Sequence, residues 1–157
     1  MVVERPLRTD LLPIEAGTYC LWLTLTHPLS LRVGRLGERT VPPGLYAYTG
    51  SARGSGGLRA RVGRHLRTGK PLRWHIDYLT ARVRPCAVWY RPGADRLECA
   101  WSAALRSIPG AQVLLPGFGS SDCACPAHLI AVPRQALGHA WHALDPESAL
   151  GALETGR

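Results

Sequence analysis

The chain has 157 residues, of which 46% are hydrophobic and 19% charged, and its formal net charge at pH 7 is +8. This composition is typical of one globular domain and excludes a disordered chain, and no apolar run reaches the roughly 20 residues that cross a bilayer. Charges and prolines interrupt residues 1–13, which therefore lack the apolar centre of a signal peptide, so we expect a cytoplasmic protein.

Strands and helices are predicted to mix along the chain. Runs rich in β-branched and aromatic residues predict strands, and Leu58, Val62 and Leu66 form the apolar stripe of a helix. In chain order we expect an N-terminal extension (1–13), a strand (19–26), a hairpin (31–33 with 39–41), a strand (45–49), helices (58–66 and 74–80), a strand (86–90), a helix from Asp95, a strand (127–132), a helix (134–144) and a loosely ordered tail (145–157). Without strict strand–helix alternation, this order predicts an α/β or α+β sheet with helices packed against it, in one domain over residues 14–144.

Positive charge is concentrated after the fourth predicted strand. Seven basic residues and no acidic one lie between Arg53 and Arg73, which favours a surface that faces phosphate groups. The N–H groups at the start of the predicted helix add a second means of binding phosphate. The residues predicted to bind nucleic acid are Arg53, Gly56, Gly57, Arg59, Arg64, Arg67 and Lys70. The plainer interpretation is that these arginines are solvated helix residues.

Two tyrosine triplets, Gly17-Thr18-Tyr19 and Tyr48-Thr49-Gly50, precede a helix that carries Arg61 and His65, and Glu98 follows on a later helix. With these residues the chain resembles the GIY-YIG nuclease superfamily. Within it, the segments GSARGSGGLRARVGRH, WHIDYL and GFGSSDCACPAHL resemble a small branch of poorly characterised domains, found alone or fused to endonuclease III-type glycosylases. The resemblance covers about residues 17–133. It implies a small mixed, mostly antiparallel sheet and a metal-dependent endonuclease that hydrolyses DNA in repair or processing.

The resemblance also implies a role for each of five residues. Glu98 would hold a single Mg²⁺ or Mn²⁺ ion, and Arg61 would neutralise charge on the phosphoryl oxygens. Tyr19, assisted by Tyr48, would orient or deprotonate the attacking water, with nearby cations lowering the tyrosine pKa, and His65 would relay the proton or bind phosphate. The two tyrosines lie 29 positions apart because of the inserted hairpin, and the asparagine that often completes the family's site is not placed in this sequence.

Each of these residues has an alternative interpretation. The tyrosines are also ordinary aromatic strand residues, and Asp95 with Glu98 has the spacing of a helix capping box. The alternative function is a non-catalytic nucleic-acid-binding module that recruits a repair enzyme. In either case the expected partner is DNA, with RNA open and no membrane.

The five cysteines are expected to be reduced thiols. Cys123, Cys125 and His128 offer ligands for zinc, with Cys99 and Asp122 as candidate additions. Because the C-x-C spacing is tighter than the usual C-x-x-C, we expect small residues around a turn, with structural zinc as the alternative. His75 and Asp77 are secondary candidates, which either border the cleft or form a structural hydrogen bond.

Overall fold

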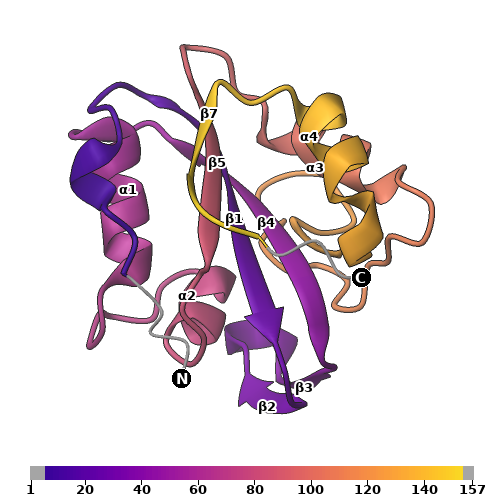
Figure 1. Ribbon diagram of the computed structural model, residues 1–157. Coiled ribbons are helices and arrows are strands. Elements are labelled where there is room, and N and C mark those ends of the chain that lie inside the picture. Colours follow the sequence, from indigo (N-terminus) through magenta and orange to yellow (C-terminus); the bar gives the residue numbers. More distant parts are fainter. Residues whose placement is uncertain (1–5, 154–157) are drawn as a thin grey trace.

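A five-stranded sheet runs through the middle of the molecule, in the order β6-β4-β1-β5-β7 (Figure 1). The structure is a computed structural model that describes residues 6–153. All four pairings in this sheet are antiparallel. The strands are β1 (Gly17–Leu25), β4 (Gly44–Ala52), β5 (Ala87–Pro92), β6 (Leu129–Ala131) and β7 (Ser148–Gly151). The predicted class, a small and mostly antiparallel sheet with helices, is confirmed.

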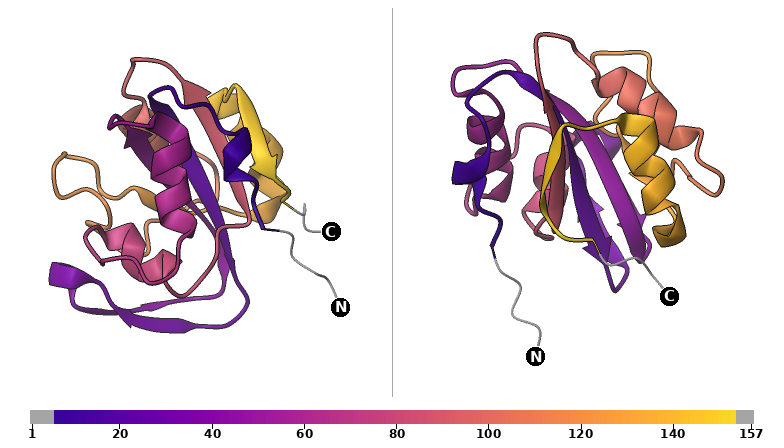
Figure 2. Two further views of the ribbon diagram at one scale, coloured as in Figure 1. Left: turned by 90° about the vertical axis from the view of Figure 1, so that its left-hand side faces the viewer. Right: turned by 45° about the horizontal axis from the view of Figure 1, so that its top comes forward.

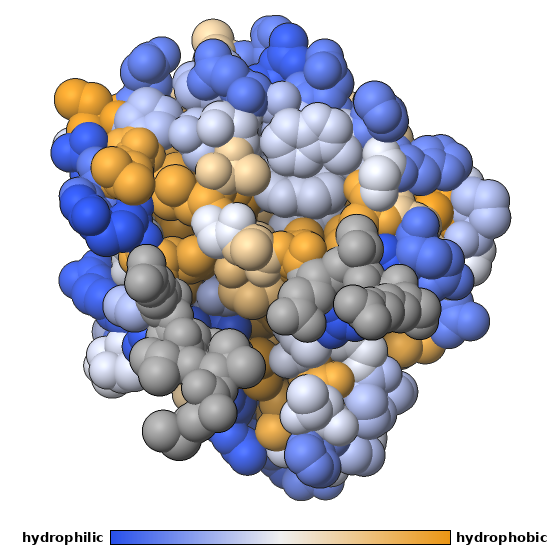
Figure 3. All heavy atoms as spheres, in the orientation of Figure 1, coloured by the Kyte–Doolittle hydropathy of each residue, from blue (hydrophilic) through white to orange (hydrophobic). Residues whose placement is uncertain are grey.

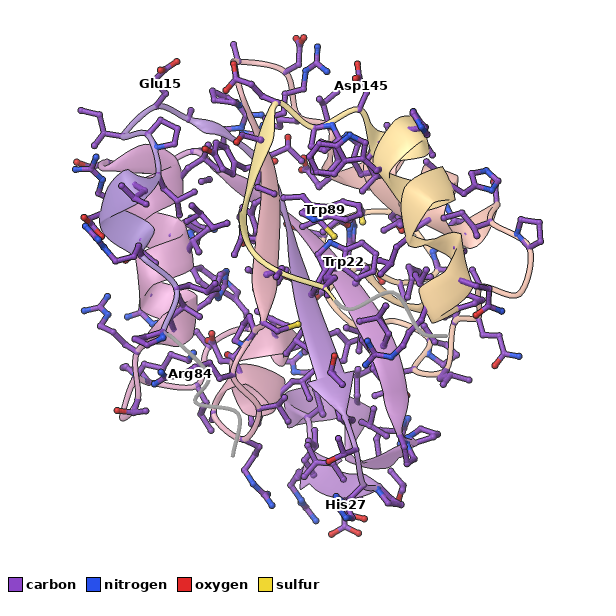
Figure 4. The ribbon with its side chains drawn as sticks, in the orientation of Figure 1. Glu15, Trp22, His27, Arg84, Trp89 and Asp145 are labelled. Carbon is purple, nitrogen blue, oxygen red and sulfur yellow. The ribbon has the colours of Figure 1, made fainter. Side chains whose placement is uncertain are left out.

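Helices cover both faces of this sheet, as Figures 1 and 2 show. The helices are α1 (Gly57–Leu66) and α2 (His75–Thr80) on one face and α3 (Glu98–Arg106) and α4 (Leu137–Leu144) on the other. Successive strand residues point to opposite faces, so Tyr19 packs with α1 and α2 while Trp22 packs with α3 and α4. Trp22 and Trp89 meet between the sheet and α4 (Figure 4), with ring centroids 4.6 Å apart. Burial on both faces explains why β1 is almost continuously apolar.

The predicted hairpin forms a separate two-stranded sheet of β2 (Leu29–Arg32) and β3 (Glu38–Val41), joined by the short helix η2 (Gly34–Leu36). It projects beyond the end of β1 at the bottom of Figure 1, and His27 marks the start of this extension in Figure 4. The insertion between the two tyrosine triplets therefore leaves the pairing of β1 with β4 uninterrupted.

The helix predicted from Asp95 begins three residues later, at Glu98, so its predicted start is wrong. Side chains that are distant in the sequence bond the backbone of the residues before Glu98 and keep these residues from being helical. The Arg53 guanidinium donates to the carbonyls of Gly93 and Ala94, and Leu97 N–H donates to the Thr18 hydroxyl at 3.1 Å. These contacts fix residues 93–97 as a loop, which no local pattern indicates.

The predicted loose tail over residues 145–157 is also wrong for its described part. Residues Ser148–Gly151 form β7 and pair with β5, and Glu147 N–H donates to the Tyr90 carbonyl at 2.9 Å. At the other end, η1 (Thr9–Leu11) packs on α1, and Leu12 is fully buried. Residues 1–5 of the predicted extension and 154–157 of the tail lie outside the described residues.

The surface is a mosaic of hydrophilic and hydrophobic residues. Figure 3 shows hydrophilic residues along most of the outline, with hydrophobic ones gathered toward the left, over η1 and α1. Leu11 and Ile14 are the most exposed of the large hydrophobic residues there. No helix within residues 6–153 is long and apolar enough to cross a bilayer.

Candidate active site

The two tyrosine triplets lie side by side because β1 pairs with β4. Tyr19 is opposite Gly50, and Leu21 is opposite Tyr48. Both tyrosine rings point to the α1 side of the sheet, where His65 is buried against them. The Tyr19 hydroxyl and His65 Nε2 form a hydrogen bond of 2.7 Å, and the Tyr48 ring lies 6.4 Å from the imidazole. The structure thus joins three residues that are far apart in the sequence.

The Tyr19 ring lies directly over the backbone of Gly50. A β-carbon at position 50 would lie 2.5 Å from both the hydroxyl oxygen and Cζ of Tyr19. Tyr19 is only 2% exposed, so its ring has little room to move. The glycine of the second triplet is therefore required by this close approach between two strands.

We expect Gly50→Ala to destabilise the protein by about 1–3 kcal/mol, because the added methyl group overpacks a filled core. It should also displace the Tyr19 hydroxyl from His65. Thermal unfolding measures the first effect. Gly54→Ala is the matched control, since a β-carbon there meets no described atom within 4 Å. Equal stability of the two variants would contradict the close approach.

Arg61 and Glu98 both form a hydrogen bond with Ser51, one with its carbonyl and the other with its hydroxyl. Arg61 Nη1 donates to the Ser51 carbonyl at 3.1 Å, and the Ser51 hydroxyl donates to the Glu98 carboxylate. The N-cap of α3 is Leu97, and Glu98 is the first helical residue, so the capping-box interpretation with Asp95 is wrong. Together with Tyr19, Tyr48 and His65, both side chains line one open cavity of about 530 Å³.

Burial controls the protonation of this site. It raises the pKa of Tyr19 far above the usual value, and the positive charge of Arg61 offsets this only in part. Burial also raises the pKa of Tyr48, and it lowers the pKa of His65 to about 3. At neutral pH both tyrosines are therefore protonated, and His65 is a neutral imidazole that burial makes a weak proton acceptor. The prediction that nearby cations lower the tyrosine pKa is therefore wrong, since the pKa values of Tyr19 and Tyr48 are both raised.

Most of the predicted phosphate ligands have other partners. Gly57 N–H donates to the Gly54 carbonyl, and Leu58 N–H donates to the Glu15 carbonyl at 2.9 Å, so the expected phosphate site at the start of α1 is wrong. Three side chains bond groups of the protein itself: Arg59 donates to the Leu12 carbonyl, Arg64 pairs with Asp77, and Lys70 donates to the His65 carbonyl and the Thr80 hydroxyl. Gly56 and Arg67 are exposed and lie outside the cavity. Arg53 lines the cavity and also donates to carbonyls of the loop before α3.

The sequence analysis counted Arg73 only in the basic segment, and it missed Trp74 and Arg96 as residues of the cavity wall. Arg73, Trp74 and Arg96 line it, and Trp74 is 39% exposed. The guanidinium carbons of Arg61 and Arg64 lie 4.6 and 4.3 Å from the centre of the Trp74 ring, within the range of cation–π attraction. The tryptophan holds Arg61 beside the cavity, and it is partly exposed there. Its place in the segment WHIDYL was the available signal.

The two secondary candidates have different roles. His75 borders the cavity, and its Nδ1 accepts a hydrogen bond from Gly119 N–H at 2.8 Å. Asp77 is fully buried and structural: it accepts two hydrogen bonds from the Arg64 guanidinium and one each from the N–H groups of Arg73 and Trp74. Asp77 therefore fixes α1 to α2 and holds Trp74 at the cavity.

A second group of side chains adjoins the cavity. We call it the Cys–His cluster: Cys99, Cys123, Cys125 and His128. Its four potential ligand atoms all lie within 4.8 Å of one another, an arrangement that can hold a metal ion. Cys99 thus joins the three predicted residues, whereas Asp122 is exposed and not part of the group. The hydrogen bond with Cys125 and burial raise the pKa of the Cys99 thiol to about 12, and burial lowers the pKa of His128.

Residues 18–145 match the model of a family described as domain of unknown function DUF123. The matched range includes all five candidate catalytic residues and the Cys–His cluster. No curated protein and no solved structure matches the chain.

Proposed function

We propose that this chain, which belongs to the family of the domain of unknown function DUF123, is a metal-dependent nuclease that hydrolyses phosphodiester bonds in DNA. One observation carries the proposal: Tyr19, Tyr48, Arg61, His65 and Glu98 line a single open cavity. The proposal includes the relationship to the GIY-YIG nuclease superfamily, with which these residues agree in kind and order.

The charge of the cavity wall supports a phosphate-bearing substrate. Its cationic side chains are Arg53, Arg61, Arg73 and Arg96, against the two carboxylates Glu98 and Asp122. A positive wall favours a phosphodiester, and the planar guanidinium can donate two hydrogen bonds to its oxygens. The exposed part of Trp74 gives a base or sugar a surface on which to pack.

Glu98 fits the role of a ligand for Mg²⁺ or Mn²⁺. Its carboxylate is half-buried, oriented by the Ser51 hydroxyl and open to the cavity, and these ions prefer oxygen ligands with several retained waters. A divalent ion held there would offset negative charge on the phosphate oxygens. Arg61, which lines the same cavity, would stabilise the charge that develops on the non-bridging oxygens.

The Tyr19–His65 pair supplies an acceptor for the proton of the attacking water. As water forms its bond to phosphorus, its proton passes to the Tyr19 oxygen and the phenolic proton passes to His65 Nε2. The bond to the leaving oxygen breaks, and solvent protonates that oxygen. A phosphate anion in the cavity would raise the pKa of His65 again, which favours the transfer.

The test is a cleavage assay on labelled duplex, flap and single-stranded DNA and on RNA, with Mg²⁺ and then Mn²⁺. We expect Arg61→Ala to cut about 10²–10³ times more slowly than wild type, because it removes stabilisation of transition-state charge. Arg35→Ala removes the same charge from an exposed position in the hairpin, outside the cavity, and should cut like wild type.

Tight, salt-sensitive binding without cleavage in either metal would overturn the nuclease and support the non-catalytic nucleic-acid-binding module. The same basic wall serves both functions, so binding alone does not distinguish them. Cleavage at equal rates by wild type and Arg61→Ala would show that the activity comes from a contaminant or from another site.

A further inference from the structure

The Cys–His cluster joins two distant parts of the chain. Cys99 lies on the first turn of α3, and the other three members lie in or at the end of the loop that precedes β6. In a tetrahedral zinc site with a Zn–S bond of about 2.3 Å and a Zn–N bond of about 2.0 Å, the sulfur and the nitrogen lie about 3.5 Å apart. His128 Nε2 lies 3.2 Å from the Cys123 sulfur and 3.9 Å from the Cys99 sulfur. These spacings approach that geometry.

The hydrogen bonds of Thr49 fix the tautomer of His128. The Thr49 hydroxyl donates its one proton to the Glu98 carbonyl at 3.1 Å, because a carbonyl can only accept. It must then accept its second hydrogen bond, of 2.8 Å, from His128 Nδ1–H. The lone pair of the imidazole is therefore on Nε2, which faces the cysteines. Metal-binding histidines are commonly held by such a bond on the other ring nitrogen.

We propose that the Cys–His cluster binds one zinc ion, and that the ion fastens the loop before β6 to the start of α3. Three sulfur ligands and one imidazole form a closed tetrahedral set of the kind found in structural zinc sites. Residues 113–128, all within the described part of the chain, contain no helix or strand, and loops of that length are uncommon without a function or an anchor.

The zinc ion would also position the candidate active site. Cys99 follows Glu98 directly, and Thr49 links the Glu98 carbonyl to His128, so two connections run from the ion to the first turn of α3. Gly119, in the same loop, bonds His75 at the cavity edge. This positioning role rests on the proposed nuclease function, whereas zinc binding does not.

The experiment measures zinc in the full chain, purified without chelator or metal-affinity tag, by mass spectrometry of the metal. We expect one zinc per chain in wild type and a loss of this zinc in Cys123→Ser. Cys86→Ser is the matched control: Cys86 lies outside the cluster and donates to the Trp22 carbonyl, which serine can also do. Chelation of wild type should lower its unfolding midpoint by about 10 °C, since metal binding contributes to folding.

Cobalt substitution keeps the test decisive if Cys123→Ser does not fold. Wild type refolded with Co²⁺ should show the intense visible bands of tetrahedral cobalt and a thiolate-to-cobalt charge-transfer band in the near ultraviolet. Zinc-free wild type without these bands would overturn the proposal, as would full zinc content in soluble Cys123→Ser. Because neither readout uses nucleic acid, a zinc-containing protein that never cuts DNA would refute the nuclease alone.

Discussion

Asp77→Ala is expected to lower the unfolding midpoint by about 6–12 °C, because it removes one partner of a buried ion pair at a cost of about 3 kcal/mol. The Asp77 side chain is fully buried, and its partner Arg64 is 16% exposed. The substitution leaves Arg64 without its carboxylate and takes the acceptor from the N–H groups of Arg73 and Trp74. Differential scanning calorimetry measures the shift.

The control for Asp77→Ala is Asp10→Ala. Asp10 pairs with Arg8, but both side chains are more than half exposed, so we expect no measurable change in the unfolding midpoint. An unfolding midpoint of Asp77→Ala that matches wild type would show that the buried pair contributes nothing to stability.

Asp77 also makes stability depend on pH. Burial by itself raises the pKa of this carboxyl, but the hydrogen bonds from Arg64 and from the backbone of Trp74 and Arg73 outweigh it, and the folded-state pKa is below the usual value. The stabilisation is therefore fully present above the unfolded-state pKa and is lost as the pH falls through the folded-state pKa. The difference in stability between wild type and Asp77→Ala should shrink in acid.

Helices and strands that depend on the pattern of neighbouring residues could be predicted from the sequence. The stripe of Leu58, Val62 and Leu66 gave α1, and the apolar run in 19–26 gave β1. The start of α3 was not predictable, because the loop before it is held by Thr18 of β1 and by Arg53, which follows β4, and both are far from it in the sequence. The strand β7 was also missed. Residues 148–151 have little intrinsic preference for a strand, and they form one because they pair with β5.

The candidate site also has parts that could be predicted from the sequence and parts that could not. Tyr19 and Tyr48 were predicted from the resemblance to the GIY-YIG superfamily, and the pairing of β1 with β4 places their two triplets side by side. The partners of the basic residues could not be predicted from sequence. Arg59, Arg64 and Lys70 bond acceptors within the protein, and a count of charges does not show this. The fourth member of the Cys–His cluster was weighed only as an addition, since Cys99 is 24 positions from Cys123 and only the fold joins them.

Glu98→Gln is expected to reduce metal-dependent cleavage by about 10³-fold, or about 4 kcal/mol in the activation barrier. Glutamine keeps the size of the side chain, and its amide oxygen can still accept the Ser51 hydrogen bond. What is lost is the negative charge that a hard divalent cation requires. Because Glu98 is half-exposed at the start of α3, the unfolding midpoint should change little.

Binding measurements separate this loss from a loss of substrate affinity. The substitution removes a negative charge from a wall that is otherwise mainly cationic, so nucleic acid should bind as tightly as to wild type or more tightly. Glu15→Gln removes the same charge from an exposed position that Figure 4 shows at the outer edge of the molecule, and it should cut normally. Zinc content should be unchanged in both variants, because Glu98 is not a member of the Cys–His cluster. Wild-type cleavage by Glu98→Gln would remove Glu98 from the mechanism, whereas lost cleavage with retained binding and retained zinc would assign the divalent cation to this carboxylate.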